Sequence, residues 1–160
     1  MAHRLMACNS VKCATPHGHN EFVTVRLAPQ PLVRLDLKAN MVEEFSKAKK
    51  LWHQWVDDRV DHAFQLGDRD PLIEYFQEKE PEKLQTILIT PGDPTTEMLA
   101  VCFMSKISKI LESQGSMLQC IEIEIEETPT NSVRFSGDPE RQLPQGNLWF
   151  RRSDSTINDF

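Results

Sequence analysis

The segment 117–128 carries the most regular hydrophobic pattern in the chain. Between residues 121 and 126, isoleucine and glutamate alternate strictly. Alternation with a period of two is typical of a β-strand that has one apolar and one polar face. We therefore expect a strand whose isoleucines, Ile121, Ile123 and Ile125, face a core. The glutamates between them should form a solvated or channel-lining face.

Shorter patterns predict the other strands and the connections. Strands are expected at residues 1–6, 19–28, 84–90 and 132–135. Residues 7–18 and 58–70 should be loops, and residues 32–37 should resume extended backbone after two prolines. A short helix should run over residues 71–78, because proline suits the first position of a helix.

Two long helices are expected between these strands. Asn40 could cap the first, which should run to about residue 57. Its apolar stripe consists of residues at helical spacing, namely Met41, Phe45, Ala48, Trp52 and Trp55. The second helix should be capped by Thr95 or Thr96 and end at Gly115, because glycine suits the left-handed conformation that follows a helix.

The order of these elements predicts the fold class. Strands and helices alternate too irregularly for a doubly wound parallel sheet. An α+β fold with an antiparallel sheet and two helices on one face fits the order better. We expect one domain over residues 1–135, followed by a C-terminal tail or interface strap over residues 136–160.

The composition limits the class of protein. Of the 160 residues, 39% are hydrophobic and 26% are charged, so the chain can bury a core. The net charge of −6 disfavours nucleic acid as a partner. No apolar run approaches the roughly 20 residues that cross a bilayer, and no secretory signal opens the chain. Four scattered cysteines do not suggest a disulfide scaffold, so we expect a reduced, cytoplasmic protein without a membrane partner.

The sequence His17-Gly18-His19 opens a predicted strand and suggests a metal site. Residues i and i+2 of a strand point to the same face, so both imidazoles can reach one ion. His3 lies on the preceding strand, and a hairpin could bring it alongside. Three histidines suit zinc and leave one position free for water or substrate. The alternative interpretation is that this short motif is a surface feature.

Cys13 lies in a polar loop, beside Lys12 and four residues before His17. A nearby positive charge favours the thiolate, which makes such a thiol a candidate nucleophile or base. The alternative is a small buried residue without function. The pair Asp61-His62 follows the first long helix, and taken alone it would be a surface pair.

Glu127 is notable for its position in the strand pattern. It shares the parity of the isoleucines, so an unbroken pleat would point its carboxylate toward the apolar side. A buried carboxylate needs donors of hydrogen bonds, which a ligand could supply. The alternative is that the strand ends at Glu126 and that Glu127 turns outward.

Taken together, these residues resemble one family. The motifs that carry the resemblance occur in this order: Ala2-His3-Arg4-Leu5, Cys13-Ala14-Thr15-Pro16-His17-Gly18-His19-Asn20, Asp61-His62, Pro94-Thr95-Thr96-Glu97 and Glu127-Thr128. The chain is similar, over residues 2 to about 135, to the 6-pyruvoyltetrahydropterin and 6-carboxytetrahydropterin synthases. The resemblance implies a tunnelling fold, in which a four-stranded antiparallel sheet carries two helices on one face. It also implies a homohexamer whose sheets join into a barrel.

The resemblance implies a role for each site residue. The zinc ligands would be His3, His17 and His19. The groups that move protons would be Cys13, Asp61 and His62. The residues that hold the pterin would be Glu127, as a bidentate anchor, together with Thr96 and Glu97.

The spacing between Cys13 and His17 helps to choose a branch of the family. Three residues intervene, which resembles the bacterial 6-carboxytetrahydropterin synthase of the queuosine pathway. The implied reaction converts 7,8-dihydroneopterin triphosphate to 6-carboxytetrahydropterin, acetaldehyde and triphosphate. Two alternatives stay open, a pyruvoyl-forming synthase that eliminates triphosphate and a non-catalytic, zinc-stabilised oligomer that binds a pterin.

Overall fold

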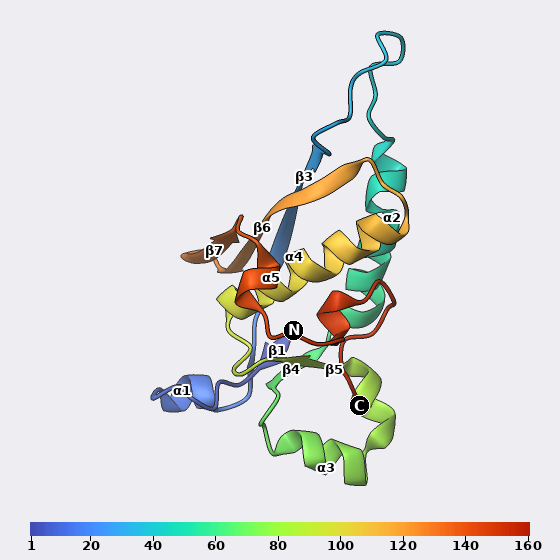
Figure 1. Ribbon diagram of the computed structural model, residues 1–160. Coiled ribbons are helices and arrows are strands. Elements are labelled where there is room, and N and C mark those ends of the chain that lie inside the picture. Colours follow the sequence, from blue (N-terminus) through green and yellow to red (C-terminus); the bar gives the residue numbers. More distant parts are fainter.

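Two small sheets and one long central helix organise the molecule in the computed structural model, which describes residues 1–160 (Figure 1). The first sheet is antiparallel, in the order β3-β6-β7. Its strands are β3 (Phe22–Pro29), β6 (Leu118–Thr128) and β7 (Asn131–Phe135). The predicted strands in these three regions are therefore confirmed.

The second sheet has the order β2-β1-β4-β5 and mixes antiparallel and parallel pairs. Its strands are β1 (Ala2–His3), β2 (His17–Gly18), β4 (Phe64–Gly67) and β5 (Ile87–Thr90). The α+β class is confirmed, but the expectation of one four-stranded antiparallel sheet is wrong. Strand β4 lies in the expected loop 58–70, and the burial of Gln65, Leu66 and Gly67 leaves no alternation to detect.

Helix α4 (Thr96–Ser113) runs across the antiparallel sheet and supplies much of the core. The predicted cap is confirmed, because Thr95 Oγ1 accepts a hydrogen bond from Met98 N at 3.3 Å. Gly115 follows the helix at φ +60°, as predicted. Neither this helix nor any other has the length and apolarity that crossing a membrane needs.

Helix α2 (Phe45–Trp55) lies beside α4 and continues into a π-helical turn, Val56–Val60. Ala48 and Trp55 are buried as predicted, whereas Met41 and Phe45 are exposed. Asn40 lies outside the helix at φ +53°, so the predicted cap is wrong. The segment before α2 is held by the turn after α4 instead, because the Glu43 carboxylate accepts hydrogen bonds from Ser116 Oγ and Met117 N.

The remaining short elements lie at the periphery. Helix α1 (Val11–Ala14) lies within the expected loop 7–18. Helix α3 (Leu72–Lys79) confirms the short helix predicted over residues 71–78, although Pro71 is its N-cap and not its first residue. A 3₁₀ turn, Pro81–Thr86, leads into β5. The segment 32–37 forms no strand and belongs to a loop that projects from the molecule between β3 and α2 (Figure 1).

A bulge in β6 changes which side chains reach the core. Ile123 and Ile125 are buried as predicted, but Ile121 is 42% exposed and Cys120 is buried instead. Arg26 pairs with Glu122 and the next residue, Leu27, pairs with Cys120, so Ile121 is the extra residue. Because side chains alternate along a strand, one inserted residue moves every earlier side chain of that strand to the opposite face of the sheet.

The last 25 residues fold back on the core. They contain α5 (Pro139–Gln142) and a 3₁₀ turn, Trp149–Arg151. Four apolar side chains of this tail are buried, namely Leu143, Trp149, Phe150 and Ile157. Beyond the turn, Ile157 O accepts a hydrogen bond from Ile89 N at 3.1 Å, so the tail covers the free edge of β5.

Lys106 of α4 is fully buried beneath this tail. Its ammonium group donates to Trp149 O at 3.0 Å, lies 3.5 Å from Asp154 and is 6.0 Å from the ring centres of Trp55 and Trp149. Burial lowers the pKa of Lys106 to about 8, and the Asp154 carboxylate opposes that shift.

The pKa of Lys106 predicts how stability changes with pH. The folded chain loses this proton near pH 8 and the unfolded chain near pH 10.5, so between these values the unfolded state binds more protons and stability rises with pH. Relative to Lys106→Met, the wild type should gain about 2 kcal/mol of unfolding free energy between pH 7 and pH 10. Denaturant unfolding at both pH values measures this. Lys109 lies on a more exposed part of the same helix. Relative to Lys109→Met, the wild type should show no gain in unfolding free energy between pH 7 and pH 10.

Candidate active site

Three imidazoles converge where β1 meets β2. His3 and His17 are paired directly in the antiparallel register, and His19 follows two residues later. The ring centres lie 4.6 to 5.2 Å apart, and one ligand atom from each residue lies within 4.8 Å of the others. The structure thus brings together the three histidines that the sequence singled out.

The hydrogen bonds of these rings indicate which nitrogens are free. His3 Nδ1 donates to Pro94 O at 3.2 Å, and His17 Nδ1 donates to Thr15 O at 2.8 Å. With the protons on Nδ1, the two Nε2 atoms are both acceptors, yet they lie only 3.1 Å apart. Two facing lone pairs repel unless a cation lies between them. Three histidine nitrogens, two of them on rings whose Nδ1 atoms are bound to backbone carbonyls, therefore fit a divalent metal such as zinc.

The electrostatics of His3 favour the same conclusion. Burial lowers the pKa of His3 below its ordinary value, and the neighbouring His17 lowers it further. The bond to Pro94 and the Glu127 carboxylate oppose this shift. A histidine that stays neutral is ready to ligate a metal ion.

A polar cavity of about 450 Å³ adjoins the segment that follows β5. Thr96, Glu97 and Glu127 line it, together with Leu5 and residues 130–133. Glu127 is half-buried at a bulge between β6 and β7, and its Oε1 accepts a hydrogen bond from Thr96 Oγ1 at 3.0 Å. The structure therefore gathers the three residues proposed to hold a ligand around one cavity.

Cys13 lies on α1, in the loop that joins β1 to β2. Its side chain is half-buried, and its carbonyl accepts a hydrogen bond from Leu5 N at 2.8 Å. Because Leu5 also lines the cavity, Cys13 is tied through the backbone to a residue of the cavity wall.

Asp61 and His62 are not brought to Cys13 within one chain. Both are exposed, and His62 Nδ1 lies 3.1 Å from Asp61 Oδ2. They precede β4, which runs parallel to β1, whereas the Cys13 loop leaves the carboxyl end of β1. The pair and the thiol therefore lie at opposite ends of these strands.

Glu21 is a half-buried carboxylate that interacts electrostatically with Glu127, and no sequence motif singles it out. Burial raises its pKa to about 7, and the nearby Glu127 adds to this shift. Its Oε2 atom is buried without a hydrogen-bond partner. The sequence does contain a signal that Glu21 points inward, because it lies two residues before Val23 and four before Val25, which face inward on β3.

The fold and the site together define a small α+β protein with a candidate three-histidine metal site beside a polar cavity. Its sequence matches the family model of 6-pyruvoyl tetrahydropterin synthase over residues 1–138, and the chain belongs to this family.

Individual relatives are distant. A probable 6-carboxy-5,6,7,8-tetrahydropterin synthase of Halobacterium salinarum is 29% identical over 118 residues, covering 74% of this chain and 69% of the relative. An uncharacterized protein of Wolinella succinogenes shares the fold with a TM-score of 0.66 at 19% identity, covering 86% and 92% of the two chains. A 6-pyruvoyltetrahydropterin synthase of Plasmodium vivax, solved as a catalytic-residue mutant, gives a TM-score of 0.55 at 17% identity, with 84% and 87% covered.

Proposed function

We propose that the protein is a zinc-dependent 6-carboxy-5,6,7,8-tetrahydropterin synthase of 7-deazapurine (queuosine) biosynthesis. It converts 7,8-dihydroneopterin triphosphate and one water molecule to 6-carboxytetrahydropterin, acetaldehyde and triphosphate. The observation that carries the proposal is the position of the histidine cluster beside the Thr96–Glu127 cavity in a chain of this family. The three-residue spacing between Cys13 and His17 and the name of the Halobacterium relative favour this branch.

In this proposal each part of the site has its own task. His3, His17 and His19 hold zinc, which when bound polarises the hydroxyl groups of the substrate side chain. The Glu127 carboxylate accepts hydrogen bonds from the amino group and ring N–H of the pterin, and Thr96 fixes its orientation. The Cys13 thiol moves protons at the carbons of the substrate side chain.

The products formed from 7,8-dihydroneopterin triphosphate test this proposal. Acetaldehyde and 6-carboxytetrahydropterin should appear together, and a chelator should abolish both. Triphosphate without acetaldehyde would identify the pyruvoyl-forming reaction instead. Binding without turnover by the zinc-loaded protein would identify a non-catalytic pterin binder.

The position of Asp61 and His62 adds a requirement for assembly. If this pair completes the proton relay with Cys13, it must come from another copy, because the two lie at opposite ends of the strands. Strands β3 and β7 also leave free edges, which pairing with other copies, up to a hexamer with a closed barrel, would cover.

Mixed variants test this shared relay. Cys13→Ala and His62→Ala should each be nearly inactive, because each lacks one partner of the relay. After joint unfolding and refolding, mixed oligomers should recover a measurable fraction of wild-type turnover, since some interfaces combine an intact thiol with an intact histidine. Each variant refolded alone is the control. A fully active monomer of wild-type protein by light scattering would contradict the proposal.

A further inference from the structure

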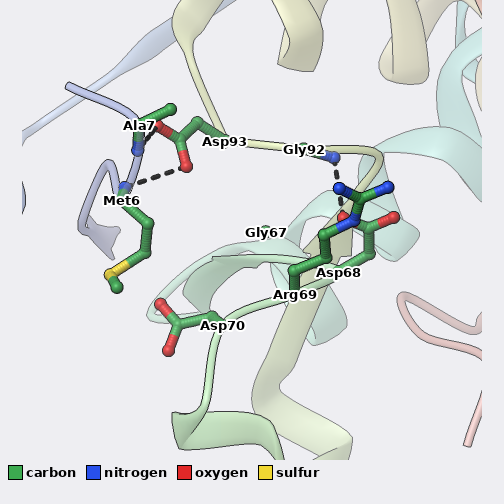
Figure 2. Close-up of a pocket in the computed structure, with 8 residues that line it drawn as sticks. All are labelled: Met6, Ala7, Gly67, Asp68, Arg69, Asp70, Gly92 and Asp93. Atoms are coloured by element: carbon green, nitrogen blue, oxygen red, sulfur yellow. Dashed lines mark hydrogen bonds between the residues drawn. The ribbon is translucent and has the colours of Figure 1, made fainter.

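Asp93 joins two segments that border the candidate active site. Its two carboxylate oxygens accept hydrogen bonds from successive backbone amides, Met6 N at 2.9 Å and Ala7 N at 2.7 Å. Figure 2 shows the carboxylate reaching across to this segment from the loop after β5. Hydrogen bonds to an ionised group are about twice as strong as neutral ones, so this contact can fix the segment in place.

On one side, the contact holds the loop that carries the thiol. Met6 directly follows Leu5, which lines the cavity and donates its backbone N–H to Cys13 O at 2.8 Å. Fixing Met6 and Ala7 therefore fixes Leu5, and through Leu5 the turn that carries Cys13. The start of the same loop is held separately, because Arg4 Nε donates to the buried Asp70 carboxylate at 2.7 Å.

On the other side, Asp93 begins the segment that orients the site. Its next residue, Pro94, accepts the hydrogen bond from His3 Nδ1, and Thr96 donates to Glu127. The backbone of Asp93 also closes a turn, since Asp93 O accepts from Thr95 N at 2.8 Å. Asp93 thus connects the loop that carries Cys13 with the segment whose hydrogen bonds orient His3 and Glu127.

This connection has a rigid base. Gly92 N donates to Asp68 Oδ1 at 3.0 Å, as Figure 2 also shows. A Cβ atom on Gly67 would lie only 2.7 Å from Gly92 O, so the ends of β4 and of the loop after β5 are in direct backbone contact. Asp93 therefore projects from a support that cannot shift easily.

We propose that Asp93 is a positioning residue, which sets the location of the Cys13 thiol relative to the cavity bounded by Thr96 and Glu127. Asp93 acts through the loop and contacts neither the thiol nor the histidines. The proposal rests on the proposed function for its effect on turnover. Its effect on the thiol itself does not depend on that function.

Two measurements on Asp93→Ala test the proposal. The turnover number should fall about 10- to 100-fold while KM changes less than about twofold, because small displacements of a reacting group have effects of this size. In a Cys8→Ser background, iodoacetamide should alkylate Cys13 at least about fivefold faster, because the loop is released. Mass spectrometry locates the label, and Cys102 and Cys120 are buried. Zinc content should not change.

Two further variants sharpen the test. Asp93→Asn keeps one oxygen that can accept a hydrogen bond, so its turnover number and its alkylation rate should lie between those of the wild type and Asp93→Ala. If Asp93→Ala fails to fold, Asp93→Asn takes its place in the test. Arg69 lines the pocket that Met6, Ala7 and Asp93 also line (Figure 2). Arg69→Ala changes the wall of this pocket but removes no hydrogen bond to the loop, so it should match the wild type in both measurements.

The positioning role of Asp93 and the proposed function can be refuted independently. A wild-type alkylation rate in both Asp93 variants would overturn the positioning role, as would a raised KM with an unchanged turnover number. If the wild type shows no pterin turnover, the proposed function fails, and the alkylation rates still decide whether Asp93 holds the loop.

Discussion

The double variant His17→Ala, His19→Ala is expected to lose its zinc completely, whereas the wild type should contain about one ion per chain. Only His3 would remain as a ligand, and a zinc site normally needs at least three protein ligands. Both side chains are only partly buried at the end of the second sheet, so their removal should leave the hydrophobic core intact. Elemental analysis of the purified protein measures the zinc, and turnover should disappear with it.

A matched control for this experiment is His53→Ala. His53 lies on the exposed side of α2 and belongs to no group of candidate metal ligands. Its zinc content should equal that of the wild type. Full zinc occupancy in the His17, His19 double variant would refute the metal site proposed here.

The parts of the fold that depend on local patterns could be predicted from the sequence. Helix α4 has a regular apolar periodicity, a threonine cap and a glycine after its end, and all three signals agree. The histidine cluster was predictable for a similar reason. Residues two apart in an extended segment point to the same face, which places His17 and His19 together, and His3 needed only a hairpin to join them.

Other parts depend on contacts between distant residues, which a local pattern does not contain. The bulge at Ile121 arises from pairing with β3, and nothing within the isoleucine–glutamate alternation signals it. Strand β4 is short and buried on both faces, so no periodicity marks it. The apolar pattern predicts too early a start for α2, and it cannot show that Glu43 contacts the turn after α4, 73 residues away.

The candidate site likewise contains residues that local motifs indicate and residues whose arrangement depends on distant contacts. Motifs indicated His3, Cys13 and Glu127 by residue type and spacing, whereas the parity argument for Glu127 fails because the strand has a bulge at this residue. Sequence could not show that Asp61 and His62 lie away from Cys13, since that follows from the parallel pairing of β1 with β4. Nor could it reveal Asp93, whose role depends on backbone amides 86 and 87 residues earlier, and backbone amides carry no sequence signature.

The contrast between Cys13→Ala and Glu127→Gln should separate chemistry from binding. Cys13→Ala is expected to lose at least about 10²-fold in turnover, as for a positioned group that transfers protons, while zinc content and pterin affinity stay nearly unchanged. Glu127→Gln should instead weaken pterin binding by roughly 1.5–3 kcal/mol, the range for a hydrogen bond to a charged group. The amide can still accept the bond from Thr96 Oγ1, so the cavity should keep its shape.

Single-turnover kinetics and equilibrium titration with a pterin measure the two effects separately. Thr130→Ala, at the rim of the same cavity, controls for changes in its shape and should affect neither quantity strongly. Equal losses of pterin binding in both variants would mean that the roles of Cys13 and Glu127 are assigned wrongly. Near-wild-type turnover in Cys13→Ala would remove the thiol from the mechanism, and the exposed pair Asp61 and His62 would then have no partner for a relay.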